Sequence, residues 1–233
     1  MHIFYLPDLS AAVVGLSEEE AGHALRVLRL AEGEQVALVD GKGTTAIGHL
    51  RILGKSDANV LITERKIHAP ERAARIHMAC APTKQIDRFE WMLEKCTEIG
   101  VDRITPLLTL RTERAHLRMD RLQKVLVSAM KQSQRAWLPT LDEPMTIQRL
   151  ISGPLPEQRL FGWCLGKHEP IKRLYNKEQD VVMLIGPEGD FTEDEATLLR
   201  ECAFLATSLG HARLRAETAA VAACTWMNFA QGT

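Results

Sequence analysis

Short apolar runs alternate with amphipathic segments over the last two thirds of the chain. The apolar runs predict strands at 76–81, 103–108, 160–164, 181–185 and 206–209. Apolar residues at helical spacing predict helices at 84–99, 119–134 and 216–229, and Gly100 closes the first of them. Thr192 and Glu195 form the capping box of a further helix. Strands that alternate with helices indicate an α/β domain with a parallel sheet.

The first 70 residues show a different pattern, with several strands and one helix. Ser17 and Glu20 predict a capping box at the start of that helix, which we expect to end near Gly33. Strands are predicted at 35–39, 45–53 and 59–65, and Asp-Gly-Lys-Gly at 40–43 joins the first two as a hairpin. The polar stretch 68–72 is the predicted linker. We therefore expect two domains, residues 1–70 and residues 73–233.

The composition is that of an ordinary soluble globular protein, with 45% hydrophobic and 25% charged residues among 233. No apolar run approaches the roughly 20 residues that a membrane helix needs. The N-terminal residues lack the pattern of a secretory signal, so we expect a cytoplasmic protein without membrane contact. The five cysteines are scattered and none has C-x-x-C spacing, which predicts reduced thiols and no metal site.

Charge is unevenly distributed along the chain. The net charge is only −1, yet residues 111–135 hold seven basic and two acidic side chains. A local basic segment of this kind can bind the phosphates of nucleic acid. The alternative is a solvated helix face whose charges serve only solubility. The pattern alone leaves both interpretations open.

Several familiar catalytic motifs are missing. Lys42 lies in a glycine-rich turn, but the residues around it do not have the spacing of a phosphate-binding P-loop. No G-x-G-x-x-G stands at a strand–helix junction, no H-E-x-x-H is present, and the nucleophile motif G-x-S-x-G is absent. These absences argue against a dinucleotide fold, a zinc protease and an acyl hydrolase.

Two glycine-bearing turns carry the strongest functional signal. Residues 185–191 read Ile-Gly-Pro-Glu-Gly-Asp-Phe, and residues 209–219 read Leu-Gly-His-Ala-Arg-Leu-Arg-Ala-Glu-Thr-Ala. Each follows an apolar run and leads into a helical pattern, a junction that leaves backbone N–H groups and close-approach glycines at a sheet edge. Together they predict one ligand pocket built mostly from main chain. The alternative is that these glycines only allow turns with positive φ.

Both turns closely resemble the C-terminal signature motifs of the ribosomal RNA small subunit methyltransferase E family. Further matches occur in order at residues 23–29, 40–43, 98–111 and 132–135, so the resemblance spans almost the whole chain. Two departures stand inside the signatures. Asp190 replaces a usual glycine, and Ala212 replaces a usual arginine, with Arg213 one position further on.

The resemblance implies a fold and an activity. The expected fold is a small N-terminal PUA-like β-barrel that binds RNA, followed by a C-terminal α/β SPOUT domain with a trefoil knot. Family members act as homodimers, bind S-adenosylmethionine in the knot, and methylate N3 of a uridine in 16S ribosomal RNA of the small subunit. Two other readings stay open: a SPOUT enzyme that acts on another RNA, and an RNA-binding or ribosome-assembly factor that no longer turns over.

The resemblance also assigns candidate site residues. The cofactor pocket is expected at Leu165, Gly166, Ile185, Gly186, Pro187, Glu188, Gly189, Leu209, Gly210 and Leu214. Arg215 is the candidate for stabilising negative charge on the uracil ring. Glu217 is the candidate base or a partner that orients Arg215, unless it is simply a carboxylate at a helix N-terminus. RNA phosphates are expected at His23, Arg26, Arg29, Lys84, Arg88, Lys95, Arg111 and Arg135.

Overall fold

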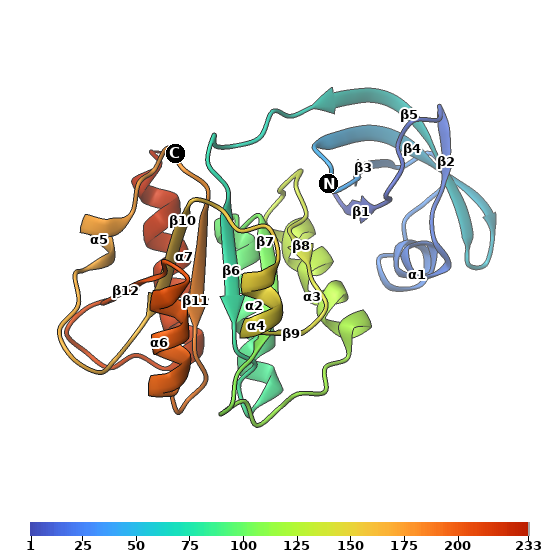
Figure 1. Cartoon of the computed structure of the whole chain (residues 1–233). Helices are drawn as coiled ribbons and strands as arrows, with labels where there is room; N and C mark the ends of the chain where they lie inside the picture. Colours follow the sequence, from blue (N-terminus) through green and yellow to red (C-terminus); the bar gives the residue numbers. More distant parts are fainter. Residues whose placement is uncertain (233) are drawn as a thin grey trace. The chain divides into compact units, whose positions relative to one another are not determined.

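A computed structural model describes residues 1–232 and divides them into two compact units (Figure 1). The first unit combines Met1–Pro70 with Val127–Leu138. The second holds Glu71–Leu126 and the chain from Pro139 onward. The segment 127–138 therefore belongs to the N-terminal unit although it lies far along the sequence.

The first unit is built on a five-stranded mixed sheet of order β1-β3-β4-β5-β2. Its strands are β1 (Ile3–Tyr5), β2 (Val13–Gly15), β3 (Gln35–Val39), β4 (Thr44–Gly54) and β5 (Asp57–Ile67). Only β1 and β3 pair in parallel among these neighbours. The predicted hairpin at 40–43 is confirmed, and the Asp40 carboxylate fixes it by accepting from the backbone N–H groups of Lys42 and Thr44. The strands alternate inward and outward, so Phe4, Leu38 and Leu50 are buried on one face.

The helix of this unit is shorter than the sequence predicts. It consists of α1 (Glu18–Gly22), which continues directly into one π-helical turn, η1 (His23–Val27). Arg29 then adopts a left-handed conformation at φ 55°, which ends the helix before Gly33. Ser17 caps the helix as predicted, but Glu20 does not complete the capping box. The Glu20 carboxylate instead accepts hydrogen bonds from Tyr5 N at 3.1 Å and from Lys131 Nζ at 2.6 Å.

The second unit contains a parallel sheet of order β12-β10-β11-β6-β7-β8, with β9 also paired to β7. Its strands are β6 (Ile76–Cys80), β7 (Arg103–Leu108), β8 (Thr140–Leu141), β9 (Met145–Thr146), β10 (Gln158–Gly162), β11 (Val181–Ile185) and β12 (Leu205–Thr207). Central strands β6 and β11 are buried at every position, which explains their unbroken apolar runs. The predicted parallel α/β sheet is confirmed.

Within the described residues from Glu71 to 232 the chain forms six helices. They are α2 (Ile86–Ile99), α3 (Met119–Gln132), α4 (Ile147–Ser152), α5 (Ile171–Leu174), α6 (Glu193–Glu201) and α7 (Ala216–Ala230). Of these, α3 extends from the second unit into the first. Gly100 ends α2 at φ 108°, and Thr192 with Glu195 forms the predicted capping box of α6. Helix α7 packs against α2 and against strands β6 and β11. No helix within residues 1–232 is long and apolar enough to cross a membrane.

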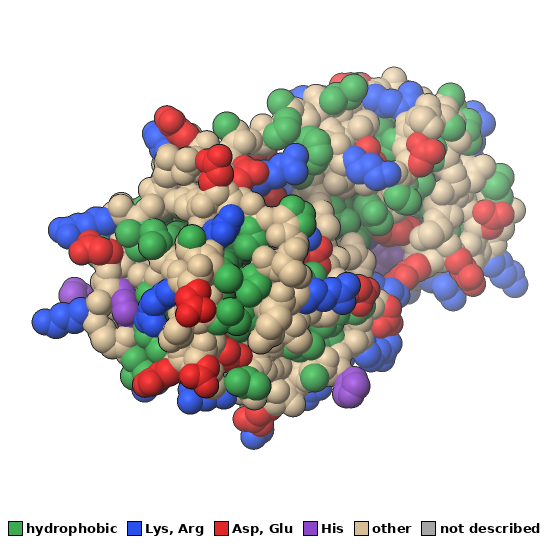
Figure 2. Space-filling view, viewed as in Figure 1, with side chains coloured by type: hydrophobic (Ala, Val, Ile, Leu, Met, Phe, Trp, Pro, Cys, Tyr) green, Lys and Arg blue, Asp and Glu red, His purple; other side chains and the backbone are tan. Residues whose placement is uncertain are grey.

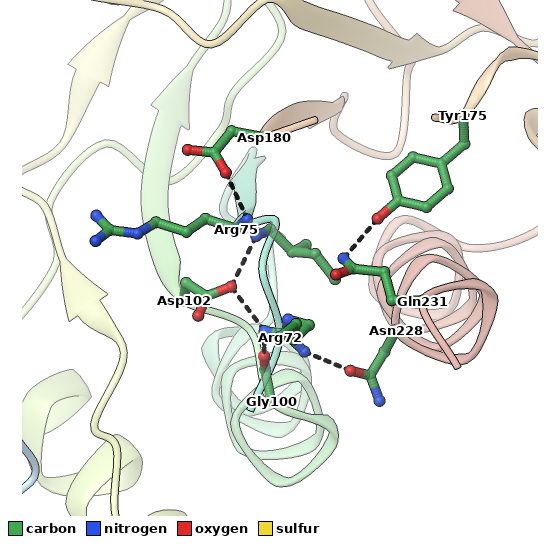
Figure 3. Close-up of polar contacts among 9 residues, drawn as sticks. Arg72, Arg75, Gly100, Asp102, Tyr175, Asp180, Asn228 and Gln231 are labelled. Carbon is green, nitrogen blue, oxygen red and sulfur yellow. Dashed lines mark hydrogen bonds and ion pairs between the residues drawn. The ribbon is translucent and has the colours of Figure 1, made fainter. Parts of the chain in front are cut away.

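A buried arginine anchors the start of the second unit (Figure 3). The side chain of Arg72 is only 5% exposed and forms an ion pair of 2.6 Å with Asp102. It also donates to the carbonyl of Gly100 and to Asn228 Oδ1. These contacts join the end of α2, the end of α7 and the residue before β7. Arg72, which the polar composition of 68–72 assigns to a linker, is thus fixed in the packed unit.

A second polar cluster is buried against β6 and β7. His77 Nε2 lies 2.7 Å from Thr105 Oγ1, and Thr105 Oγ1 donates to Asp142. Arg103 binds the same Asp142 carboxylate through two N–H groups. Burial, and to a lesser degree the charge of Arg103, lowers the pKa of His77 to about 4, against an opposing effect of Asp142. The imidazole is therefore neutral at neutral pH.

Candidate cofactor and substrate site

Five loops of the second unit leave the sheet at one edge. Strands β12, β10, β11, β6 and β7 are consecutive neighbours and parallel, so the loops after them start from the same side. They cover residues 208–215, 163–170, 186–192, 81–85 and 109–118. In open α/β sheets ligands bind outside the carboxyl ends of the strands. Both glycine-bearing turns that the sequence singles out lie at this edge.

The glycines of these loops serve different purposes. Gly210 has a φ of 136°, and a Cβ placed there would meet nothing within 4 Å, so its backbone is open to a ligand. Gly186 and Gly189 have no positive φ, although the alternative interpretation required one. A Cβ at Gly186 would lie 3.1 Å from Phe191 N, and one at Gly189 would lie 3.1 Å from Arg111 Cδ. Close packing against backbone accounts for Gly186, whereas the close neighbour of Gly189 is a flexible side chain.

Apolar side chains stand beside the open backbone. Leu165 is 54% exposed, which is high for a leucine, and Leu209 and Leu214 are half-buried. Ile185, at the end of β11, is buried. Main-chain groups and aliphatic side chains are the surroundings that suit a flat, uncharged ring.

Asp190 ties two of the loops together. Its Oδ2 accepts from Cys164 N at 3.0 Å, and its Oδ1 accepts from Phe191 N at 2.8 Å. The residue has a φ of 61°, a left-handed conformation in which aspartate is tolerated better than most residues. Burial raises the pKa of the Cys164 thiol, with Asp190 adding to the shift and Arg213 opposing it. The departure from the family pattern at Asp190 thus supplies a bridge between the β10 and β11 loops.

Further hydrogen bonds fix the β6, β7 and β11 loops to one another. Glu188 Oε1 accepts from Lys84 N at 3.0 Å. Arg111 Nη1 donates to the carbonyls of Gly189 and Phe191, the latter at 3.0 Å. Arg111, which the sequence assigns to RNA phosphate, therefore also holds the β11 loop.

The two catalytic candidates lie at the start of α7 in unlike surroundings. Arg215 is the N-cap residue and is exposed, and within the described residues its side chain makes no hydrogen bond or ion pair. Glu217 is 8% exposed, and its Oε2 is buried without a hydrogen-bond partner among residues 1–232. Glu217 lies among Cys80, Thr83 and Ile185, and the space between them is too small for a water molecule.

The charged neighbour of Glu217 is Arg88 rather than Arg215. Arg88 Nε on α2 lies 3.9 Å from Glu217 Oε1. The structure thus gives no support to Glu217 as a partner that orients Arg215. It also places Arg88, an RNA candidate, beside the buried carboxylate. The sequence carries no signal for this pair, because the two residues are far apart in the chain.

The candidate RNA residues are spread over both units. His23, Arg26 and Arg29 are exposed around η1 of the first unit. Lys84 pairs with Glu113 at 2.9 Å, and Lys95 pairs with Glu94 and Glu98, its neighbours on α2. Lys95 is therefore a surface salt-bridge partner in this structure.

The basic segment 111–135 is not one continuous surface of free cations. Arg135 belongs to the first unit and Arg111 to the second. Arg118 pairs with Asp120 at 2.9 Å, and Arg121 with Glu90 at 2.5 Å. On the face drawn in Figure 2, basic and acidic side chains are correspondingly interspersed.

Comparison with known proteins agrees with this architecture. The RNA methyltransferase domain family matches residues 70–228, and the RNA methyltransferase PUA domain family matches residues 16–63. The chain is 30% identical over 224 residues to ribosomal RNA small subunit methyltransferase E of Synechocystis sp., covering 93% of this chain and 73% of that protein. It is 28% identical to the protein of the same name from Rickettsia conorii, covering 89% and 85%. The crystal structure of ribosomal RNA small subunit methyltransferase E from Neisseria gonorrhoeae bound to S-adenosyl methionine superposes with a TM-score of 0.89 at 28% identity, covering 99% of this chain and 98% of that one. The chain therefore belongs to the ribosomal RNA small subunit methyltransferase E family of RNA methyltransferases.

Proposed function

We propose that this protein transfers a methyl group from S-adenosylmethionine to N3 of a uridine in 16S ribosomal RNA. The observation that carries the proposal is the carboxyl edge of the parallel sheet, where the loop after β12 carries the open backbone of Gly210 and leads into Arg215 and Glu217 at the start of α7. Family membership supports the reaction class.

The residues at this edge fit the proposed cofactor. The main chain at Gly210 is unobstructed, and Leu165, Leu209 and Leu214 offer apolar contact to an adenine ring. Gly166, with a φ of 89°, lets the β10 loop turn back beside them. Pro187 and Gly189 shape the turn that Asp190 N closes onto the carbonyl of Pro187 at 2.9 Å. When bound, S-adenosylmethionine supplies an electrophilic methyl group on a positively charged sulfur.

The chemistry left to the protein is to handle a proton and a developing charge. The N3 proton of uracil is weakly acidic, so its removal needs a base or a cation near the ring. Glu217 Oε2 is an acceptor without a hydrogen-bond partner in the described chain, but it is buried, so it can take the proton only if substrate binding exposes it. The exposed guanidinium of Arg215 is suited to stabilise the anionic ring. Arg88, 3.9 Å from Glu217, is the charged neighbour of this carboxylate.

A homodimer and a trefoil knot in the second unit belong to the same proposal, as does a cytoplasmic location. Exposed apolar side chains on two helices that pack together support the dimer. Trp91 on α2 is 42% exposed and Phe229 on α7 is 70% exposed. Large apolar groups left in water on neighbouring helices favour a partner surface.

Mass spectrometry of 16S ribosomal RNA from cells with and without the gene tests the proposal. We expect one uridine to lose a methyl group in the deletion strain and to regain it with the wild-type gene but not with Arg215→Ala. Because a methyl on N3 blocks base pairing, the same position should stop reverse transcription. A methyl group lost from another RNA would refute the 16S assignment. Unchanged RNA together with no binding of S-adenosylmethionine would identify a non-enzymatic RNA-binding factor.

A further inference from the structure

A second hollow lies at the same edge of the sheet, outside the candidate cofactor pocket. It is lined by Lys84 from the β6 loop and by Glu113, Arg114, Ala115 and His116 from the β7 loop. Three of these five side chains are basic or can become so, and one is acidic. We propose that this hollow binds a phosphodiester of the substrate RNA close to the target uridine; this inference rests on the proposed function.

The geometry leaves the guanidinium of Arg114 ready for a ligand. Its Nε donates to the carbonyl of Lys84 at 3.1 Å, which fixes the side chain in direction. Both Nη groups are left for a ligand, because no hydrogen bond of theirs occurs within residues 1–232. Two parallel N–H groups of one guanidinium match two oxygens of a phosphate. A fixed arginine loses less conformational freedom on binding than a mobile one.

Glu113 does not prevent an anion from entering. It pairs with Lys84 at 2.9 Å, but the two side chains are 60% and 70% exposed. The pair raises the pKa of Lys84, so the ammonium stays charged. Exposed ion pairs contribute little to stability, so a phosphate can displace the carboxylate.

The order of strands favours RNA over the cofactor as the ligand. The candidate cofactor residues lie on the loops after β10, β11 and β12, whereas this hollow lies on the loops after β6 and β7. From β10 to β7 there are three strand spacings, or about 14 Å. The Lys84 backbone is bound to Glu188 and the Arg111 side chain to the β11 loop, so the hollow keeps a set position beside the pocket. That separation suits a phosphate one or two nucleotides from the methylated base.

The test uses the full-length protein and a fragment of 16S RNA that the wild type binds. Arg114→Ala and His116→Ala should each weaken RNA binding about tenfold, and Arg114→Ala should reduce the salt slope of log Kd by about one. Glu113→Gln should tighten RNA binding, a gain that misfolding cannot mimic. Arg118→Ala is the matched control, because Arg118 is exposed and paired with Asp120. Affinity for S-adenosylmethionine should stay unchanged in all four.

Neutral methylphosphonate links placed one at a time in the RNA locate the contact. At one position near the target uridine, the neutral link should weaken wild-type binding and abolish the difference between wild type and Arg114→Ala. The inference is overturned if Arg114→Ala binds like Arg118→Ala, or if no position removes the difference. A wild type that binds the RNA but does not methylate uridine N3 would refute the proposed function while leaving the phosphate contact measurable.

Discussion

The bridge made by Asp190 gives a graded prediction for cofactor affinity. Its carboxylate accepts from two backbone N–H groups, and it does so from a left-handed conformation. Hydrogen bonds to charged groups are worth about 1.5–3 kcal/mol each, and half-exposure places these at the lower end, about 3 kcal/mol together. The left-handed conformation costs a non-glycine residue about 1 kcal/mol relative to glycine.

Three substitutions separate the bridge from the strain. Asp190→Ala loses both hydrogen bonds and keeps the strain, so the ordered loop is destabilised by about 3 kcal/mol. Asp190→Gly also relieves the strain, which reduces the loss to about 2 kcal/mol. Asp190→Asn keeps one good acceptor and should lose about 1.5 kcal/mol. If cofactor binding must restore the loop, affinity for S-adenosylmethionine falls by up to about a hundredfold for the alanine variant, thirtyfold for the glycine variant and tenfold for the asparagine variant.

Titration calorimetry with S-adenosylmethionine measures this order, and urea denaturation confirms that each variant is folded. Asp180→Ala is the control. The Asp180 carboxylate also accepts a hydrogen bond from a backbone N–H, that of Arg75 (Figure 3). Asp180 directly precedes β11, however, so it lies at the opposite edge of the sheet. It should lower stability without changing cofactor affinity. Equal affinities for the alanine and glycine variants would refute the role of strain. Wild-type affinity in all three would remove Asp190 from the pocket altogether.

The two catalytic candidates and two buried polar residues of the second unit yield shorter predictions. Arg215→Ala should lower the single-turnover methylation rate about a hundredfold with little change in ligand affinity, as rapid-quench assays would show. Glu217→Gln should methylate slowly at neutral pH, and its rate should recover as rising pH ionises N3 of the free RNA. If the ratio of the variant's rate to the wild-type rate does not change with pH, Glu217 is not the base. Because the pKa of His77 is about 4 when folded and near 6.5 when unfolded, the unfolded state binds the proton first, so stability should fall by about 3 kcal/mol as pH drops from 6.5 to 4. Urea denaturation at both pH values checks this, and His77→Gln should lessen the loss. Arg72→Met should cost about 3 kcal/mol and lower Tm, since Asp102 loses its ion pair.

The sequence predicts much of the second unit because its elements are long and sharply patterned. Buried parallel strands such as β6 and β11 leave unbroken apolar runs, and Gly100 marks a helix end by a conformation that favours glycine. Strands β8 and β9 have two residues each, and helix α5 has four. Elements this short show no hydrophobic periodicity in the sequence, because only their tertiary contacts hold them in a helix or a strand.

The candidate site is only partly readable from the chain. The glycine turns point to the right edge of the sheet, because the loop after a parallel strand always leaves at its carboxyl end. The partners of the charged residues are not readable. Glu217 meets Arg88 on another helix, and Arg111 meets carbonyls of the β11 loop. Such pairs depend on which elements become neighbours, and a local pattern does not encode that.

The first unit is discontinuous along the chain, and this constrains how the protein can have been assembled. Gly43 N donates to the carbonyl of Ala136 at 2.9 Å, and a Cβ at Gly43 would collide with the ring of Trp137. The polypeptide passes from one unit to the other three times, after Pro70, after Leu126 and after Leu138. A gene fragment that ends at residue 70 would encode a sheet without the segment that covers its hairpin. A fusion or truncation at residue 70 would therefore leave the hairpin of the first unit uncovered.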